Sequence, residues 1–124
     1  MNECAQNRRG IANDFKKYRK VFIALGDETR QHIFIALLEN EKIGMRVPEI
    51  TKRTHLSRPA VSHHLQILKD AGLINMHRVG TMNYYYVDAN ESCWRGLKAL
   101  VDRVDHIVEQ AAKAGYPVWE DNEE

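Results

Sequence analysis

Residues 56–74 read LSRPAVSHHLQILKDAGLI, and they carry both the start and the stop signal of one helix. Ser57 is a suitable N-cap because its hydroxyl can accept a hydrogen bond from an otherwise unpaired backbone N–H. Pro59 fits a first turn, where no intrahelical donor is needed. Gly72 suits the left-handed position that follows a last turn. The sequence therefore predicts a helix that begins after Ser57 and ends before Gly72.

The predicted helix has one apolar face and one face of hydrogen-bonding side chains. Val61, Leu65 and Leu68 recur at the spacing of a helix face that packs inward. The opposite face holds the residue types that reach base edges and phosphates in a DNA major groove. These outward residues are Arg58, Ser62, His63, Gln66 and Lys69. Because this composition also fits an ordinary solvated amphipathic helix, the neighbouring segments decide between the two interpretations.

A shorter helix is predicted immediately upstream. Residues 47–54 have the length of two helical turns, and Pro48 is suited to the first of them. His55 and Leu56 leave room for only a tight turn before Ser57. Two short helices joined in this way form a helix-turn-helix, in which the second helix enters the major groove of DNA.

Two β-rich segments, 73–79 and 83–87, follow the second helix and flank a turn that contains Gly80. We expect the tyrosines of the later segment to pack within the strand rather than to stack on bases. The hairpin tip carries side chains suited to phosphates or to the minor groove, namely Arg78 and Thr81. Together the segments predict an α+β fold, mainly helical with a small β-hairpin, of the winged helix-turn-helix type.

Amphipathic helices flank this domain on both sides. A helix from Asn13 to Leu25 and a second one capped by Asp27 supply apolar residues to the core. The last helix, from about Asn90 to Ala114, has apolar residues at alternating spacings of three and four, which is typical of a helix that pairs with another helix. This stripe comprises Trp94, Leu97, Val101, Val104 and Val108. We expect it to join two copies in a two-fold homodimer; the alternative is that it packs only on its own domain.

Most of the chain resembles the winged-helix transcriptional regulators typified by the arsenical-resistance operon repressor, the ArsR family. The similarity begins at residues 22–30, continues through 56–74 and ends at 84–86. It implies a DNA-binding repressor with wing contacts at Arg78 and Thr81. It also implies that four positions of the second helix lie toward the major groove, namely Arg58, Pro59, Ser62 and His63.

Two metal sites that occur in relatives of this family are missing here. One uses a Cys-x-Cys before the second helix, where residues 46–50 read Arg-Val-Pro-Glu-Ile. The other uses an Asp-x-His, but residues 88–90 lack the histidine, and Val101 and Val104 occupy the places of the later ligands. We therefore expect no metal and no cofactor. The last helix could still present a ligand group, or else a solvated charged face, through Asp102, His106 and Glu109.

Two cysteines lie far apart in the sequence, so no disulfide framework is indicated and free thiols are the default in a reducing compartment. Cys93 lies near the predicted start of the final helix, where the helix dipole favours a thiolate. If the N-terminal segment folds over a dimer, Cys4 of one chain could approach Cys93. A thiol switch is therefore the alternative to two inert cysteines.

The 124 residues carry a net charge of +1 and are 44% hydrophobic, which fits one globular domain. We expect its core at about 13–114 and flexible tails at 1–12 and 116–124. No apolar run approaches the roughly 20 residues of a membrane span, and the start of the chain is no signal peptide, so we expect a cytoplasmic protein. Basic residues gather around the helix-turn-helix and in the N-terminal third, which suffices for local attraction to phosphates.

The sequence thus predicts a homodimeric repressor that binds double-stranded DNA at an inverted-repeat operator. No Gly-rich phosphate loop, nucleophile elbow or His-Glu-x-x-His motif is present, so we do not expect an enzyme. Two alternatives stay open: a winged-helix protein-interaction module, and a thiol- or metal-responsive sensor of the same type. The residues do not identify an effector.

Overall fold

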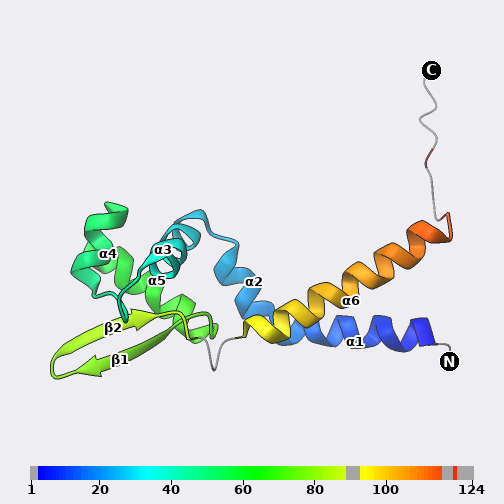
Figure 1. Cartoon of the computed structure of the whole chain (residues 1–124), viewed down its shortest axis with the longest axis horizontal. Helices are drawn as coiled ribbons and strands as arrows, with labels where there is room; N and C mark the ends of the chain where they lie inside the picture. Colours follow the sequence, from blue (N-terminus) through cyan, green and yellow to red (C-terminus); the bar gives the residue numbers. More distant parts are fainter. Residues whose placement is uncertain (1–2, 89–92, 116–118, 120–124) are drawn as a thin grey trace, which may run out of the picture. The chain divides into compact units, whose positions relative to one another are not determined.

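The structure is a computed structural model that describes residues 3–88, 93–115 and 119, with the backbone alone for residues 3–5 and 7. Figure 1 shows the order of its elements, which are α1 (Glu3–Lys17), α2 (Arg19–Leu25), α3 (Glu28–Glu39), α4 (Val47–Thr54), α5 (Arg58–Asp70), β1 (Asn75–Val79), β2 (Met82–Tyr86) and α6 (Trp94–Lys113). They form two compact units. One comprises Lys17–Trp94, and the other brings together most of α1 and α6.

The core of the Lys17–Trp94 unit is built around α5. Its inward residues Val61, Leu65 and Leu68 are each 0% exposed, and α5 packs against α2, α3 and α4. Ile33 from α3 and Ile50 from α4 are equally buried in this core. Each such aliphatic side chain contributes about 1.5–3 kcal/mol by leaving water. The apolar face predicted for this helix is therefore confirmed, and its burial determines which residues of α5 face outward.

The predicted ends of α5 are also confirmed. The backbone N–H of Ala60 donates to Ser57 Oγ at 3.3 Å, which caps the first turn. At the other end Gly72 has a φ of +81°, and the N–H groups of Gly72 and Leu73 donate to carbonyls of the last turn. The link from α4 turns at His55, which adopts the left-handed conformation with a φ of 60°. The two helices thus form the expected helix-turn-helix.

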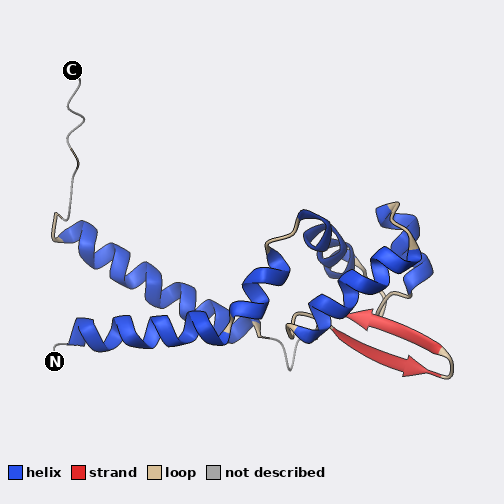
Figure 2. Ribbon diagram, turned by 180° about the vertical axis from the view of Figure 1, so that it is seen from behind, coloured by secondary structure: helices blue, strands red, loops and turns tan. Residues whose placement is uncertain are grey.

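Strands β1 and β2 form the predicted antiparallel hairpin, which extends as a two-stranded arm in Figure 2. A further pairing holds this arm, because Met45 and Tyr85 exchange two backbone hydrogen bonds of 2.8 Å each. Gly44 allows the close approach: its φ is +91°, and a Cβ there would lie 2.9 Å from the Cβ of Tyr84. The winged helix-turn-helix in an α+β fold is therefore confirmed.

The N-terminal region differs from the prediction of one helix from Asn13 to Leu25. Helix α1 already begins at Glu3, and the helical conformation is interrupted at Tyr18, which separates α1 from α2. The end of α2 is then held by Arg30, whose guanidinium donates to the carbonyls of Ala24 at 2.9 Å and Ile23 at 3.1 Å. An apolar periodicity that continues through the break conceals it in the sequence. The N-cap predicted for α3 is confirmed, since Asp27 accepts from the backbone of Arg30 at 2.9 Å.

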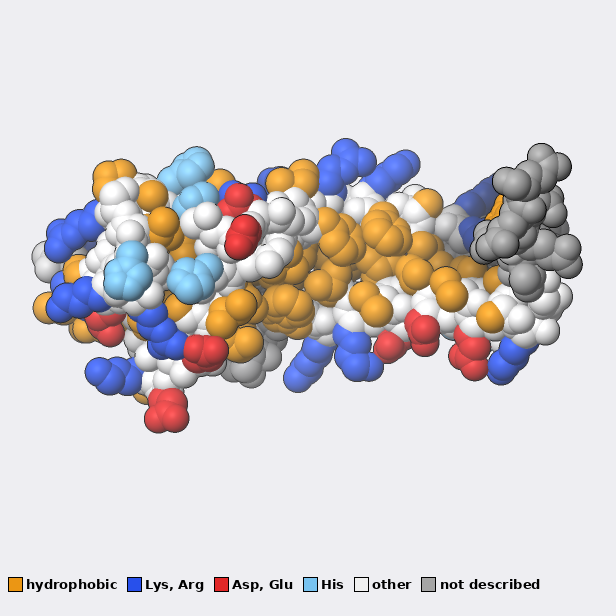
Figure 3. Space-filling model, turned by 90° about the horizontal axis from the view of Figure 1, so that it is seen from above, with side chains coloured by type: hydrophobic (Ala, Val, Ile, Leu, Met, Phe, Trp, Pro, Cys, Tyr) orange, Lys and Arg blue, Asp and Glu red, His pale blue; other side chains and the backbone are white. Residues whose placement is uncertain are grey.

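The unit formed by α1 and α6 is a pair of helices. Arg103 on α6 makes an ion pair with Asp14 on α1. A Cβ added at Gly10 would meet the guanidinium of Arg103 at 4.0 Å, an ordinary contact. Figure 3 shows a broad hydrophobic band along this unit, with Lys, Arg, Asp and Glu side chains beside it. Among the described residues, no helix is both long and apolar enough to cross a membrane.

Truncation of a core residue of α5 tests the packing of the Lys17–Trp94 unit. We expect Leu65→Ala to lower the free energy of unfolding by about 2–5 kcal/mol, because it leaves a cavity at a fully buried site. The measurement is urea denaturation at one fixed protein concentration. The adjacent exposed substitution Gln66→Ala serves as the control and should change stability by no more than about 0.5 kcal/mol. Equal effects of the two substitutions would contradict this packing.

Candidate nucleic-acid interface

The outward face of α5 is presented to solvent. Five of the side chains assigned to DNA contact are exposed and the sixth, Lys69, is half-buried. The exposed ones are Arg58, Pro59, Ser62, His63 and Gln66. A helix of 13 residues capped at its start provides a rigid platform for these donors and acceptors. This surface, which we call the α5 face, is the largest set of predicted contact residues that one element brings together.

Two local interactions shape the α5 face. The side-chain amide nitrogen of Gln66 donates to the carboxylate of Asp70 at 2.8 Å, so this side chain is held along the helix and its amide N–H is partly engaged within the protein. Arg58 stands in the first turn, beside backbone N–H groups that carry the positive end of the helix dipole. Phosphate groups are favoured at such a helix start. The arrangement combines an anion-attracting end with hydrogen-bonding side chains further along the helix.

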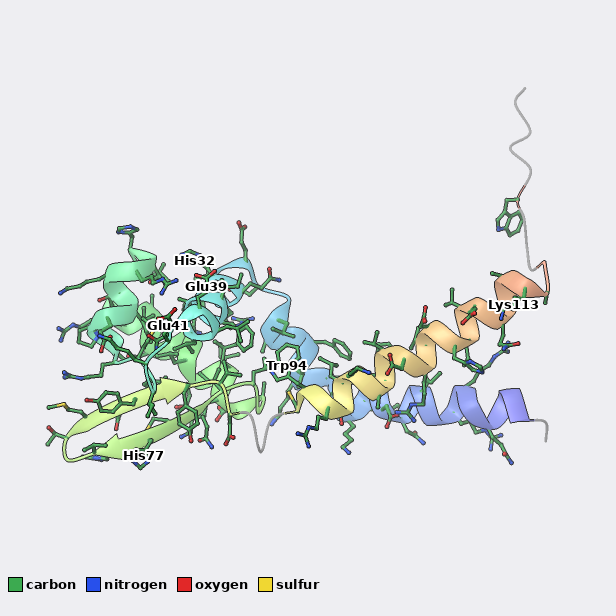
Figure 4. All side chains as sticks on the ribbon, in the orientation of Figure 1. His32, Glu39, Glu41, His77, Trp94 and Lys113 are labelled. Atoms are coloured by element: carbon green, nitrogen blue, oxygen red, sulfur yellow. The ribbon has the colours of Figure 1, made fainter. Side chains whose placement is uncertain are left out.

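The hairpin places its basic residue at the tip. Arg78 Nε donates to the carbonyl of Gly80 at 2.9 Å, which holds the guanidinium beside the turn. Thr81 is exposed within the same turn, whereas Tyr84, Tyr85 and Tyr86 are half-buried along β2. The half-burial of the tyrosines agrees with strand packing rather than with rings presented to bases. His77 on β1, labelled in Figure 4, is a further exposed side chain of the arm.

His64 is turned inward, unlike its neighbour His63. The two rings lie 5.5 Å apart at 59°, and the Nδ1 atom of His64 is buried with no hydrogen-bond partner among the described residues. Burial lowers the pKa of the His64 imidazolium below its ordinary value; the carboxylate of Asp27 opposes this shift, while Arg30 and His63 add to it. The pKa of Asp27 is lowered in turn, chiefly by the hydrogen bond from the backbone of Arg30. The outward position predicted for His63 agrees with its exposure, whereas the sequence does not assign His64 to either side.

Helix α4 carries two basic residues, of which one forms an ion pair within the protein. Arg53 of α4 makes a 2.5 Å ion pair with Glu39 at the end of α3, whereas Lys52 is exposed. The sequence alone does not distinguish these two basic residues, because the ion pair joins Arg53 to a residue that is distant in sequence. The contribution of α4 to attraction for phosphates therefore comes from Lys52 more than from Arg53.

The apolar stripe predicted for dimerisation is divided along α6. Leu97 is buried by the chain itself, and Trp94 packs against Phe34 with ring centroids 5.4 Å apart. Further along, Val101 and Val108 are 56% and 60% exposed, with Val104 half-buried between them. Only this later part of the stripe presents apolar surface that the chain itself leaves uncovered.

The charged face of α6 is occupied by ion pairs. Lys98 bonds Asp102 at 2.9 Å and Lys113 bonds Glu109 at 3.2 Å, each pair one helical turn apart. In the part of the chain that the structure describes, no three His, Cys, Asp or Glu residues are grouped so that they could hold a metal ion. The candidate group of Asp102, His106 and Glu109 therefore has the character of a solvated charged face.

The thiol of Cys93 is half-buried just before α6. Burial raises the pKa of this thiol, which is opposite to the shift expected from the helix dipole. The thiol form is thus favoured and its reactivity is reduced. Cys4 belongs to α1, where the structure describes its backbone but not its side chain.

Known proteins resemble this chain in sequence. The profile of the family described as bacterial regulatory protein, arsR family, matches residues 27–76. An uncharacterised HTH-type transcriptional regulator of Methanocaldococcus jannaschii is 40% identical over 93 residues, which cover 75% of this chain and 97% of that protein. The arsenical resistance operon repressor of Bacillus subtilis is 35% identical over 82 residues, covering 66% of this chain and 74% of the repressor.

Solved structures show the same fold. An ArsR-like transcriptional regulator from Rhodococcus sp. RHA1 superposes with a TM-score of 0.72 at 24% identity, covering 83% of this chain and 90% of that one. A winged helix-turn-helix domain from Mycobacterium bovis, described as homodimeric and DNA-binding, gives a TM-score of 0.56 at 22% identity, covering 90% and 93% of the two chains. The likeness extends beyond the helix-turn-helix to most of the chain.

The half-buried imidazole of His64 should make stability depend on pH. An unfolded histidine has a pKa near 6.5, and the folded value is lower, so protons bind preferentially to the unfolded chain. The contribution of His64 is complete above about pH 6.5 and is lost as the pH falls from there toward the folded pKa. We expect the free energy of unfolding, measured in urea at pH 7.5 and 5.5, to fall over this interval.

Substitution of each neighbouring histidine identifies the source of this slope. His64→Asn should reduce the decrease between pH 7.5 and 5.5, because the half-buried ring whose pKa is lowered is removed. His63→Asn, at the exposed neighbouring position, is the control: it removes only the smallest contribution to the shift of the His64 pKa and should keep most of the wild-type slope. A full slope in the His64→Asn variant would show that another group titrates.

Proposed function

Since the chain belongs to the ArsR family of bacterial regulatory proteins and is a helix-turn-helix transcriptional regulator, we propose that it represses transcription as a homodimer bound to an inverted-repeat operator. The observation that carries the proposal is the α5 face. Its hydrogen-bonding side chains are solvent-exposed on a capped helix, while the apolar face of the same helix is buried. A repressor among its relatives, that of the arsenical resistance operon, supports this direction of regulation.

The proposed contacts divide between bases and phosphates. Arg58, Ser62 and His63 are assigned to base edges in the major groove, because their exposed side chains offer donors and acceptors there. Gln66 joins them through its carbonyl oxygen, and Pro59 adds apolar contact. Lys69 is assigned to a phosphate. The hairpin residues Arg78 and Thr81 are assigned to neighbouring phosphates or to the minor groove of the DNA.

The proposed dimer is based on the uncovered part of the α6 stripe. Val101 and Val108 expose more than half of their surface, and Phe15 on α1 is exposed as well. Apolar side chains gathered into a band of this kind are characteristic of an interface. An interface of this kind between two copies has two-fold symmetry, which sets two α5 helices in successive major grooves about one helical turn apart. Trp94 and Leu97 then pack within their own chain and are not part of the proposed interface between the two copies.

This function requires no catalytic step and no bound cofactor, and we therefore assign none. It also places the protein in the cytoplasm, where a prokaryotic regulator meets its operator. A winged-helix module that binds another protein through the α5 face is the competing function. The two differ in their response to DNA and salt, because phosphate contacts release counterions and weaken steeply as salt rises.

DNA binding can be measured with a duplex that the protein itself selects from random sequence. We expect binding at low salt with a steep inverse dependence on salt concentration. His63→Ala should weaken the selected duplex by about 1–3 kcal/mol and relax the base preference, since it removes a base contact. Lys69→Ala should weaken all duplexes alike and reduce the salt slope by about 1.

His32→Ala is the control for these variants, because His32 is an exposed histidine on α3 that lies outside the proposed interface (Figure 4). It should leave affinity and preference unchanged. Failure of the wild-type protein to bind any duplex at low salt would favour the protein-interaction module instead. Unchanged selectivity in His63→Ala would place the base-reading side of α5 elsewhere.

A further inference from the structure

A run of basic side chains surrounds the start of α2, outside the α5 face and the hairpin tip. Residues 15–26 contain Lys16, Lys17, Arg19 and Lys20 but no Asp or Glu. The last three of these cations belong to the Lys17–Trp94 unit, and all three are exposed. We call Lys17, Arg19 and Lys20 the basic cluster. Its side chains are free to meet a partner from solvent.

The basic cluster lacks counter-ions within the protein. The nearest acidic residues on either side in the sequence are Asp14 and Asp27, and these are paired with Arg103 and Arg30. Among the described residues, no carboxylate forms an ion pair with a member of the cluster. Like charges held this close repel one another, and a bound polyanion would relieve that repulsion.

Packing holds the basic cluster against the domain. Between its members, Tyr18 is half-buried, and the ammonium of Lys17 lies 5.5 Å from the centre of the Tyr18 ring. One turn later Val21 and Ala24 are 3% and 0% exposed, and α2 packs against α3 and α5. Because these core contacts fix α2, the cations are presented on a rigid surface.

The basic cluster continues the α5 face at the end of that helix. Lys20 lines a hollow together with Ile67, Asp70 and Ala71, which belong to the last turn of α5 and its cap. The carboxylate of Asp70 accepts from the side-chain amide of Gln66, a member of the α5 face, at 2.8 Å. Lys20 therefore lies beside the end of α5 that is remote from the N-cap.

The length of α5 favours a DNA backbone as the partner of these cations. A helix of 13 residues is about 20 Å long, whereas the major groove of B-DNA is about 12 Å wide. When the first turns of α5 meet base edges, its last turn reaches the rim of the groove, where the phosphates lie. An anionic membrane would suit the exposed Phe22 and Ile23, but it does not explain the continuity with α5.

We propose that Lys17, Arg19 and Lys20 form a second phosphate-binding surface, which contacts the backbone of the same duplex that the α5 face reads. This inference rests on the proposed function and adds to it a contact from outside the helix-turn-helix and the hairpin. The cations supply affinity that is independent of base sequence, because phosphates carry no direct sequence information.

Acetylation of lysines in the wild-type protein tests the contact directly. The protein is treated with sulfosuccinimidyl acetate, free and saturated with the duplex that it selects, and each lysine is quantified by mass spectrometry. We expect the duplex to slow modification of Lys17 and Lys20 at least fivefold. Lys42, an exposed lysine in the loop after α3, is the control and should react equally in both samples.

Unchanged reactivity of Lys17 and Lys20 in a complex that does form would overturn this inference and leave the proposed function intact. Equal protection of Lys42 would also overturn it, because the shielding would then be general. If the protein forms no complex with any duplex, both proposals fail. A parallel sample with phosphatidylserine vesicles covers the other partner, and protection by the vesicles in place of the duplex would overturn the assignment to DNA.

A matched pair of double variants measures the number of phosphates involved. Arg19→Gln with Lys20→Gln should lower the salt slope of binding by about 2, since each phosphate contact contributes about 0.9. Between 50 and 200 mM salt the wild-type protein should therefore lose about tenfold more affinity than this variant. The base preference should stay unchanged.

The control for these measurements is Arg8→Gln with Arg9→Gln, which removes the same charge from two adjacent exposed positions of α1 in the other unit. It should keep the wild-type salt slope. An equal reduction of the slope in the two variants would show that net charge alone is responsible and would contradict a local contact.

Discussion

The burial of one side of α5 is the constraint on which the rest of the structure depends. Val61, Leu65 and Leu68 are completely removed from water, and this fixes the rotation of the helix about its axis. Since side chains of a helix are spaced at about 100°, the outward direction of Arg58 and His63 follows from that burial. A rotation that exposed the leucines would cost several kcal/mol. The position of the hydrogen-bonding side chains is thus a consequence of packing.

The other elements of the Lys17–Trp94 unit hold this helix and its hairpin in place. Ser57 and Gly72 define the ends of α5, and the backbone pairing of Met45 with Tyr85 attaches the arm to the loop after α3. An isolated two-stranded hairpin is marginally stable in water. The third short segment at Met45 therefore gives the tip residue Arg78 a defined base from which to reach a nucleic-acid backbone.

Features that arise from local sequence could be predicted, and features that arise from distant contacts could not. Caps and apolar spacing specify α5 within one short segment, which is why its ends and its buried face agree with expectation. The pairing of Met45 with Tyr85 joins residues that no periodicity connects. The inward turn of His64 likewise depends on how separate elements meet. For Cys93 the helix dipole argued for a thiolate, but burial, visible only in the folded chain, outweighs it.

The most direct test of the central claim is a hydroxyl-radical footprint of the protein on a duplex that it has selected. If the α5 face reads DNA and is presented by each of two subunits, the protected sugars fall in two segments whose centres are about one helical turn apart and related by a two-fold axis. A single protected segment without that symmetry, at concentrations that saturate the duplex, would contradict the account.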